Sequence, residues 1–68
     1  MSQFKVGDVV TLIMDAPDEG LEAGQIGTVV FGFTEPTIAY EIEFTDEEGR
    51  TVAQLALLPS QISRSTVK

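Results

Sequence analysis

The stretch EAGQIGTVV, residues 22–30, decides the fold, because it joins a pair of glycines to a run of β-branched residues. Gly24 and Gly27 are typical of a tight turn and of close packing between backbones, since glycine has no side chain to prevent either. A loop that cradles phosphate would instead open a helix and be followed by a lysine, and neither is present in this stretch. The stretch therefore predicts a turn that leads into a strand of a small β domain.

Outward from this stretch, short β-branched and aromatic runs alternate with turn residues, and no run shows the length and periodicity of a helix. Residues 15–25 form a long polar loop in this interpretation, and residues 58–61 form a single tight turn. The expected strands are residues 9–14, 26–33, 38–44 and 51–57, with a short closing strand that begins at Ile62. This spacing predicts an all-β protein, a small five-stranded SH3-like (KOW-like) barrel in residues 1–63, followed by a short polar tail at residues 64–68.

The predicted core follows from alternation along the strands. Apolar and acidic positions alternate in residues 38–44, which predicts one buried face and one solvated face. In residues 26–33, Gly32 indicates a bulge or bend, and Phe31 is expected on the same side as Val29. Phe33 lies at the end of the hairpin, where it either packs at the rim of the barrel or contacts a partner. The residues predicted to face inward are Val10, Leu12, Val29, Phe31, Ile38, Tyr40, Ile42, Phe44, Leu55 and Ile62.

Two resemblances cover this pattern. VGDVV at residues 6–10, together with GQIGTVV at residues 24–30, resembles the KOW-type turn and strand of ribosomal proteins and transcription elongation factors. Over nearly the whole chain, the segments VGDVVTL, DxPxxGLxAGxxGTVV, YEIEF and DEEGRTVAQLAL are similar to a family of small bacterial proteins catalogued as a domain of unknown function. That resemblance implies a small barrel with no established activity. The basic and aromatic residues through which KOW domains contact RNA have no counterparts in this chain.

The residue types that are missing argue against catalysis. The chain has no cysteine and no histidine, so the usual general base and the commonest metal ligands are missing. A barrel of this size fills its interior with its own side chains, which leaves no room for a substrate pocket. We therefore expect no enzyme activity, no catalytic residue, no cofactor and no metal site. Whether the two acidic loops together hold a weakly bound metal ion stays open, because calcium needs about six converging oxygens.

The charge distribution points to a class of partner. The 68-residue chain has a formal net charge of −7, and residues 6–63 contain all eleven acidic residues against Arg50 alone, a net charge of −10. Such a field repels phosphate backbones and attracts basic surfaces. We expect a basic protein partner, no nucleic acid and no membrane association, because no apolar run approaches the length of a membrane span. The expected location is the cytoplasm, and the oligomeric state stays open.

The candidate partner-binding residues fall into two acidic clusters and one aromatic position. They are Glu41, Glu43, Asp46, Glu47, Glu48 and Arg50 in the first cluster, Asp15, Asp18, Glu19, Leu21 and Glu22 in the second, and Phe33. The charge favours a small acidic protein-binding module that docks on a basic protein, for example as an antitoxin or an immunity-type neutraliser. The alternatives are a KOW-like accessory module in a translation or transcription assembly, and a small structural subunit of a larger complex.

Overall fold

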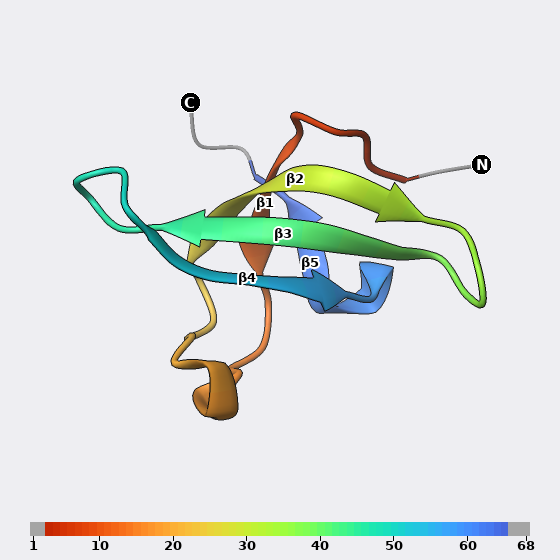
Figure 1. The fold of residues 1–68 in the computed structure, drawn as a ribbon. Coiled ribbons are helices and arrows are strands. Elements are labelled where there is room, and N and C mark those ends of the chain that lie inside the picture. Colours follow the sequence, from red (N-terminus) through yellow and green to blue (C-terminus); the bar gives the residue numbers. More distant parts are fainter. Residues whose placement is uncertain (1–2, 66–68) are drawn as a thin grey trace.

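A computed structural model of the chain describes residues 3–65, and in these residues the protein is all-β (Figure 1). The strands are β1 (Val9–Leu12), β2 (Ile26–Phe33), β3 (Ala39–Thr45), β4 (Thr51–Leu57) and β5 (Ile62–Arg64), and two single 3₁₀ turns are η1 (Pro17–Glu19) and η2 (Pro59–Gln61). The predicted all-β class with five strands is confirmed. No helix in the described part of the chain is long and apolar enough to cross a membrane.

The five strands form one antiparallel sheet in the order β4-β3-β2-β1-β5. The first part of β2 pairs with both β1 and β3, and its second part pairs with β3 alone. In Figure 1, β1 and β5 cross behind β2, β3 and β4, so the sheet folds over itself and encloses the core between two layers. Within residues 3–65 the two edge strands do not pair with each other, so the fold is barrel-like but the sheet is not closed.

The core lies between these two layers and confirms most of the predicted inward-facing residues. Leu55 is only partly buried and packs against the core. Phe4 and Tyr40 pack edge to face, with ring centroids 5.3 Å apart, and the Tyr40 hydroxyl accepts a hydrogen bond from the Phe4 backbone N–H. The buried hydrophobic residues are Phe4, Val10, Leu12, Leu21, Val29, Tyr40, Ile42, Phe44, Leu57 and Ile62. The sequence pattern missed Phe4, Leu21 and Leu57.

Two predicted core positions are wrong. Phe31 is 55% exposed, because the register of β2 against β3 shifts between Val29, which is opposite Ile42, and Phe31, which is opposite Glu41. One extra residue in β2 at this point reverses the face on which the following side chains lie. Ile38 is 39% exposed, and it precedes β3 in the turn that joins the two strands.

Two element boundaries also differ from the prediction. β1 ends at Leu12 and not at residue 14. Arg64, expected in the polar tail, belongs to β5 and lies opposite Val10. The remainder of the predicted tail, residues 66–68, lies outside the described residues. The tight turn expected at residues 58–61 is confirmed as η2, where the Gln61 side chain accepts a hydrogen bond of 2.8 Å from the Leu58 N–H.

The glycines of the opening stretch have the two roles expected of them. Gly24 has a φ of +99°, a left-handed conformation that side chains disfavour, and its N–H donates a 2.7 Å hydrogen bond to the Leu12 carbonyl. Gly27 is instead needed for close packing, because a Cβ atom at this position would lie 2.6 Å from Ile42 Cγ2. The turn and the strand that follows it are therefore both specified by residues 22–30.

Candidate functional site

The acidic hairpin between β3 and β4 is organised by Asp46. Its Oδ1 accepts hydrogen bonds from the backbone N–H groups of Glu48 and Arg50, at 2.8 and 2.9 Å. Its Oδ2 accepts a bond of 3.0 Å from Arg50 Nε. These bonds, first of all the one from the Arg50 backbone N–H, lower the pKa of Asp46 below its usual value of 3.8. Asp46 therefore closes the turn, and its oxygens are already occupied.

The rest of the hairpin tip carries less free charge than its sequence suggests. Arg50 forms a 2.7 Å ion pair with Glu48 as well as the pair with Asp46. A shallow depression is lined by Asp46, Glu47, Glu48 and Arg50. In the described structure, Glu47 forms neither a hydrogen bond nor an ion pair. Arg50 thus engages two of the three carboxylates of this tip, and Glu47 is the uncommitted one.

A second group of predicted residues lies on the solvent side of β2, β3 and β4, which we call the outer face. In the strand register, Phe31 is opposite Glu41, and Glu41 is in turn opposite Ala56 on β4. Glu43 is opposite Gln54. The outer face consists of Phe31 and Phe33 from β2, Glu41 and Glu43 from β3, and Gln54 and Ala56 from β4.

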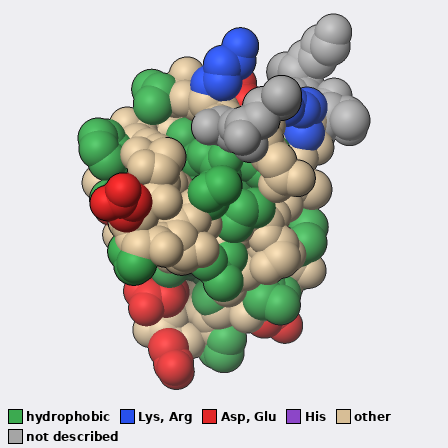
Figure 2. Space-filling view, turned by 90° about the vertical axis from the view of Figure 1, so that its right-hand side faces the viewer, with side chains coloured by type: hydrophobic (Ala, Val, Ile, Leu, Met, Phe, Trp, Pro, Cys, Tyr) green, Lys and Arg blue, Asp and Glu red, His purple; other side chains and the backbone are tan. Residues whose placement is uncertain are grey.

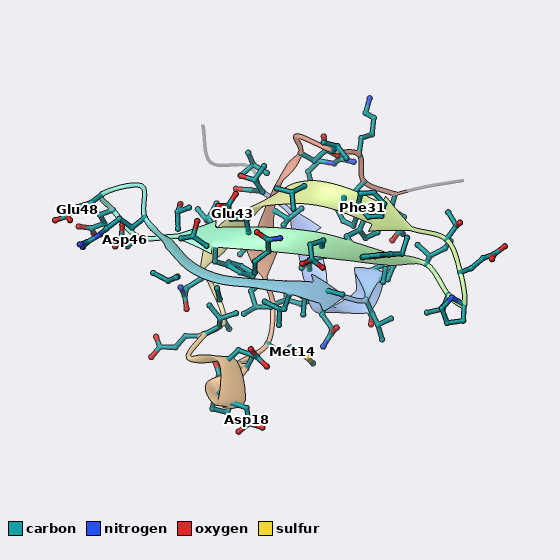
Figure 3. The ribbon with its side chains drawn as sticks, viewed as in Figure 1. Met14, Asp18, Phe31, Glu43, Asp46 and Glu48 are labelled. Atoms are coloured by element: carbon teal, nitrogen blue, oxygen red, sulfur yellow. The ribbon has the colours of Figure 1, made fainter. Side chains whose placement is uncertain are left out.

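Both carboxylates of the outer face are held by β4. Gln54 Nε2 donates a hydrogen bond of 3.2 Å to Glu41 Oε2, and Thr51 Oγ1 donates one to Glu43 Oε2. Glu41 and Glu43 are half-buried. These bonds hold the two side chains along the strand while leaving part of each open to solvent. Figure 3 shows Glu43 and Phe31 over the β2 and β3 part of the sheet, with Asp46 and Glu48 out at the hairpin tip.

Two phenylalanines complete the outer face. Phe31 and Phe33 pack edge to face, with ring centroids 4.9 Å apart, and Phe33 is half-buried. The side-chain alternation of a regular strand placed Phe31 in the core, so sequence reasoning missed it as a surface residue. The bulge expected at Gly32 lies instead at Val30, between the pairs formed by Val29 and Phe31, and this position decides the face on which Phe31 lies. The outer face thus combines two carboxylates with an aromatic pair, of which Phe31 is exposed and Phe33 is half-buried.

The second acidic cluster, in the loop from residue 15 to residue 25, is a separate feature. Asp15 Oδ1 accepts a 2.9 Å hydrogen bond from the Ala23 N–H, which fixes the loop. Leu21, predicted as an apolar contact for a partner, is wrong in that role because only 1% of it is exposed. Its backbone exchanges hydrogen bonds of 3.0 and 3.1 Å with Ala16, which turns the side chain into the core. Asp18, Glu19 and Glu22 are exposed.

The two acidic clusters do not form one site. In Figure 3, Asp18 lies in the η1 loop at the bottom of the molecule, well away from Asp46 and Glu48. Within residues 3–65, no group of three or more His, Cys, Asp or Glu side chains is arranged to hold a metal ion. The geometry of the described residues therefore offers no metal centre shared by the two loops.

Arg64, in the edge strand β5, lies apart from the outer face. Arg64 forms an ion pair of 3.4 Å with Asp8, and its guanidinium lies over the ring of Phe4, 5.6 Å from the centroid. Figure 2 shows Lys and Arg side chains at the upper end of one side of the molecule, while most of the acidic side chains visible on this side lie at mid-height or lower.

Comparison with known proteins places the chain in a family. No curated protein and no solved structure gives a significant match. Residues 7–64 match the family described as a domain of unknown function, DUF4926, and this range contains all five strands of the sheet. Since this match takes in far more than half of the chain, the protein belongs to the DUF4926 family.

Proposed function

We propose that the protein is a small acidic protein-binding module that docks on a basic protein partner in the cytoplasm. An antitoxin or an immunity-type neutraliser is one form that such a module takes. The observation that carries the proposal is the outer face, where Glu41 lies opposite the exposed Phe31, which packs against Phe33, and Glu43 lies two residues further along the same face of β3.

The chemistry of this face suits a basic protein surface. Carboxylates that are held in place attract lysine and arginine and lose little conformational entropy when they pair. Exposed aromatic rings are enriched at protein interfaces, and their faces also attract a guanidinium or ammonium group. The net charge of −7 adds a long-range field of the same sign. Attraction at a distance and recognition at contact therefore favour the same class of partner.

The finer fold assignment belongs to the same proposal. We propose that the sheet is an SH3-like barrel, supported by the strand order and by the 3₁₀ turn between β4 and β5. A KOW-like module that contacts RNA is less well supported, because a phosphate-binding face needs a basic stripe. The outer face contains two carboxylates and no basic residue.

The test compares two double variants that each remove two negative charges. The first is Glu41→Gln with Glu43→Gln, in which glutamine can still hydrogen-bond to β4. The second is the matched control, Asp18→Asn with Glu19→Gln, in the exposed η1 turn. The wild type and both variants are immobilised and exposed to the same cell lysate. Basic proteins that the wild type recovers and the Glu41→Gln, Glu43→Gln variant does not are then purified, and their association rates are measured by stopped flow.

We expect the outer-face variant to slow association by about tenfold at low salt and to reduce the salt dependence of that rate. The control should change the rate far less, since its charges lie elsewhere. Equal effects of both variants on the association rate would show that the outer face contributes only its share of the net charge. Wild-type rates for the outer-face variant at every salt concentration would place the interface on another surface.

A further inference from the structure

The strand β4 forms an open border of the sheet (Figure 1). It pairs with β3 on one side. Among the described residues, its backbone makes no hydrogen bond to any strand or loop on the other side. A β-bulge at Val52 leaves Ala53 to Leu57 as the regular part of this edge. The N–H and C=O groups that point outward from this stretch are therefore available to another strand.

The composition of β4 lacks the features with which proteins usually protect an edge. Its sequence, TVAQLAL, contains no charged residue and no proline, although lysine, proline and inward-pointing charges are the usual means of protection. The opposite edge, β5, is shorter and carries a charged residue. It is three residues long and ends in Arg64. Of the two edges, β4 is thus the one suited to the addition of a strand.

The charges next to β4 indicate the chemistry of that strand. Glu41 and Glu43 are two residues apart on β3 and share the outer face. A strand added to β4 would lie about 9.6 Å from β3, which is two strand spacings of about 4.8 Å. A lysine or arginine side chain and a glutamate side chain together cover that distance. Opposite Glu41, only the small side chain of Ala56 lies between them.

We propose that β4 accepts an extended basic segment of the partner protein as a sixth strand, with lysine or arginine at every second position facing Glu41 and Glu43. This inference rests on the proposed function and specifies how the partner binds. Backbone hydrogen bonds along the edge supply affinity, and the alternate side chains supply specificity. A second copy of this chain is a poorer occupant, because each copy carries a net charge of −7.

The test uses synthetic peptides and the full chain. The probe is a capped octapeptide in which lysine and threonine alternate, and its matched control has the same composition with the lysines grouped at one end. In two further versions of the alternating peptide, the backbone nitrogens are N-methylated at the odd or at the even positions. Only alternate N–H groups of an added strand point toward β4, so one of the two versions blocks these hydrogen bonds whether the peptide binds parallel or antiparallel. Peptide titration gives Kd, and amide hydrogen exchange locates the bound strand.

We expect the alternating peptide to bind about tenfold more tightly than the grouped control and to slow exchange at amides of β4. One N-methylated version should lose this binding, and Glu41→Gln with Glu43→Gln should weaken it. Equal binding of both N-methylated versions, or slowed exchange in β1 or β5, would overturn the inference. If binding then still depends on Glu41 and Glu43, the acidic docking function survives and only strand addition is wrong. Slowed exchange at β4 in a dimer without peptide would show that a second copy is the occupant, which also overturns it.

Discussion

At the scale of single residues, Gly27 shows how closely the strands pack. A Cβ atom at this position would lie 2.6 Å from Ile42 Cγ2, 2.9 Å from the Glu43 carbonyl oxygen and 2.9 Å from Phe44 Cδ1. Two of these atoms belong to fully buried core residues, and the third is backbone in the neighbouring strand. None of the three can move away without disturbing the β2 and β3 pairing, so the absence of a side chain at residue 27 is a packing requirement.

We therefore predict that Gly27→Ala destabilises the protein by about 1–3 kcal/mol, the usual cost of overpacking a core. The matched control is Gly32→Ala in the same strand, where the nearest atom to a new Cβ is 3.8 Å away, on Tyr40. Alanine in an open strand position is neutral or slightly stabilising relative to glycine. Chemical denaturation of both variants measures the difference. Equal free energies of unfolding would show that the close approach at Gly27 costs nothing.

At the scale of elements, β2 carries two different surfaces because of one bulge. Before the bulge, Val29 is fully buried beside Ile42. After it, Phe31 lies beside Glu41 and is 55% exposed. A strand without the extra residue would turn both Phe31 and Phe33 toward the core and remove the aromatic pair from the outer face. The bulge thus creates the aromatic part of the outer face out of a sequence that is typical of a buried strand.

The prediction at this scale compares two phenylalanines with opposite environments. Phe44→Ala should cost about 3–5 kcal/mol, because Phe44 is fully buried, and that loss is enough to unfold much of so small a domain. Phe31→Ala should cost less than about 1 kcal/mol, since most effects at exposed positions are small. Thermal melting followed by circular dichroism distinguishes them. Similar losses of stability for both variants would show that Phe31 is buried in the core, and this would contradict the bulge at Val30.

At the scale of the whole molecule, the arrangement of charge sets the class of partner. Four basic residues stand against eleven acidic ones. Arg50 and Arg64 are both engaged with carboxylates. A negative field over a sheet face attracts cationic groups and repels phosphates, and added salt screens both effects.

We predict no measurable binding of single-stranded or duplex DNA or RNA at physiological salt. Fluorescence anisotropy with labelled oligonucleotides tests this, with a basic single-strand-binding barrel protein as the positive control. Nucleic-acid affinity that arises from phosphate contacts falls steeply with salt. A micromolar Kd that weakens with added salt would therefore contradict the acidic docking function and favour a KOW-like role.

The sequence by itself determined the strands and, where a strand is regular, its buried face; only the tertiary structure decided which side chains face the solvent beside a bulge or in a loop that folds back. Turn residues and β-branched runs predicted the five strands and the break at η2, because these are local backbone preferences. The alternation in β3 likewise placed Ile42 and Phe44 in the core. Local preferences act over a few residues, so they hold wherever a strand stays regular.

Three features escaped this reasoning because each depends on which segments pair with one another, and local preferences do not fix that pairing. The bulge at Val30 is a mismatch between β2 and β3, and it alone exposes Phe31. Leu21 is buried because its loop folds back through the bridge to Ala16, although the residues around it are polar. Arg64 reads as part of a tail, yet it lies opposite Val10, more than fifty positions earlier in the chain. Register and loop closure are set by pairing across the fold, so residues 22–30 could predict the strand but not the surface it presents.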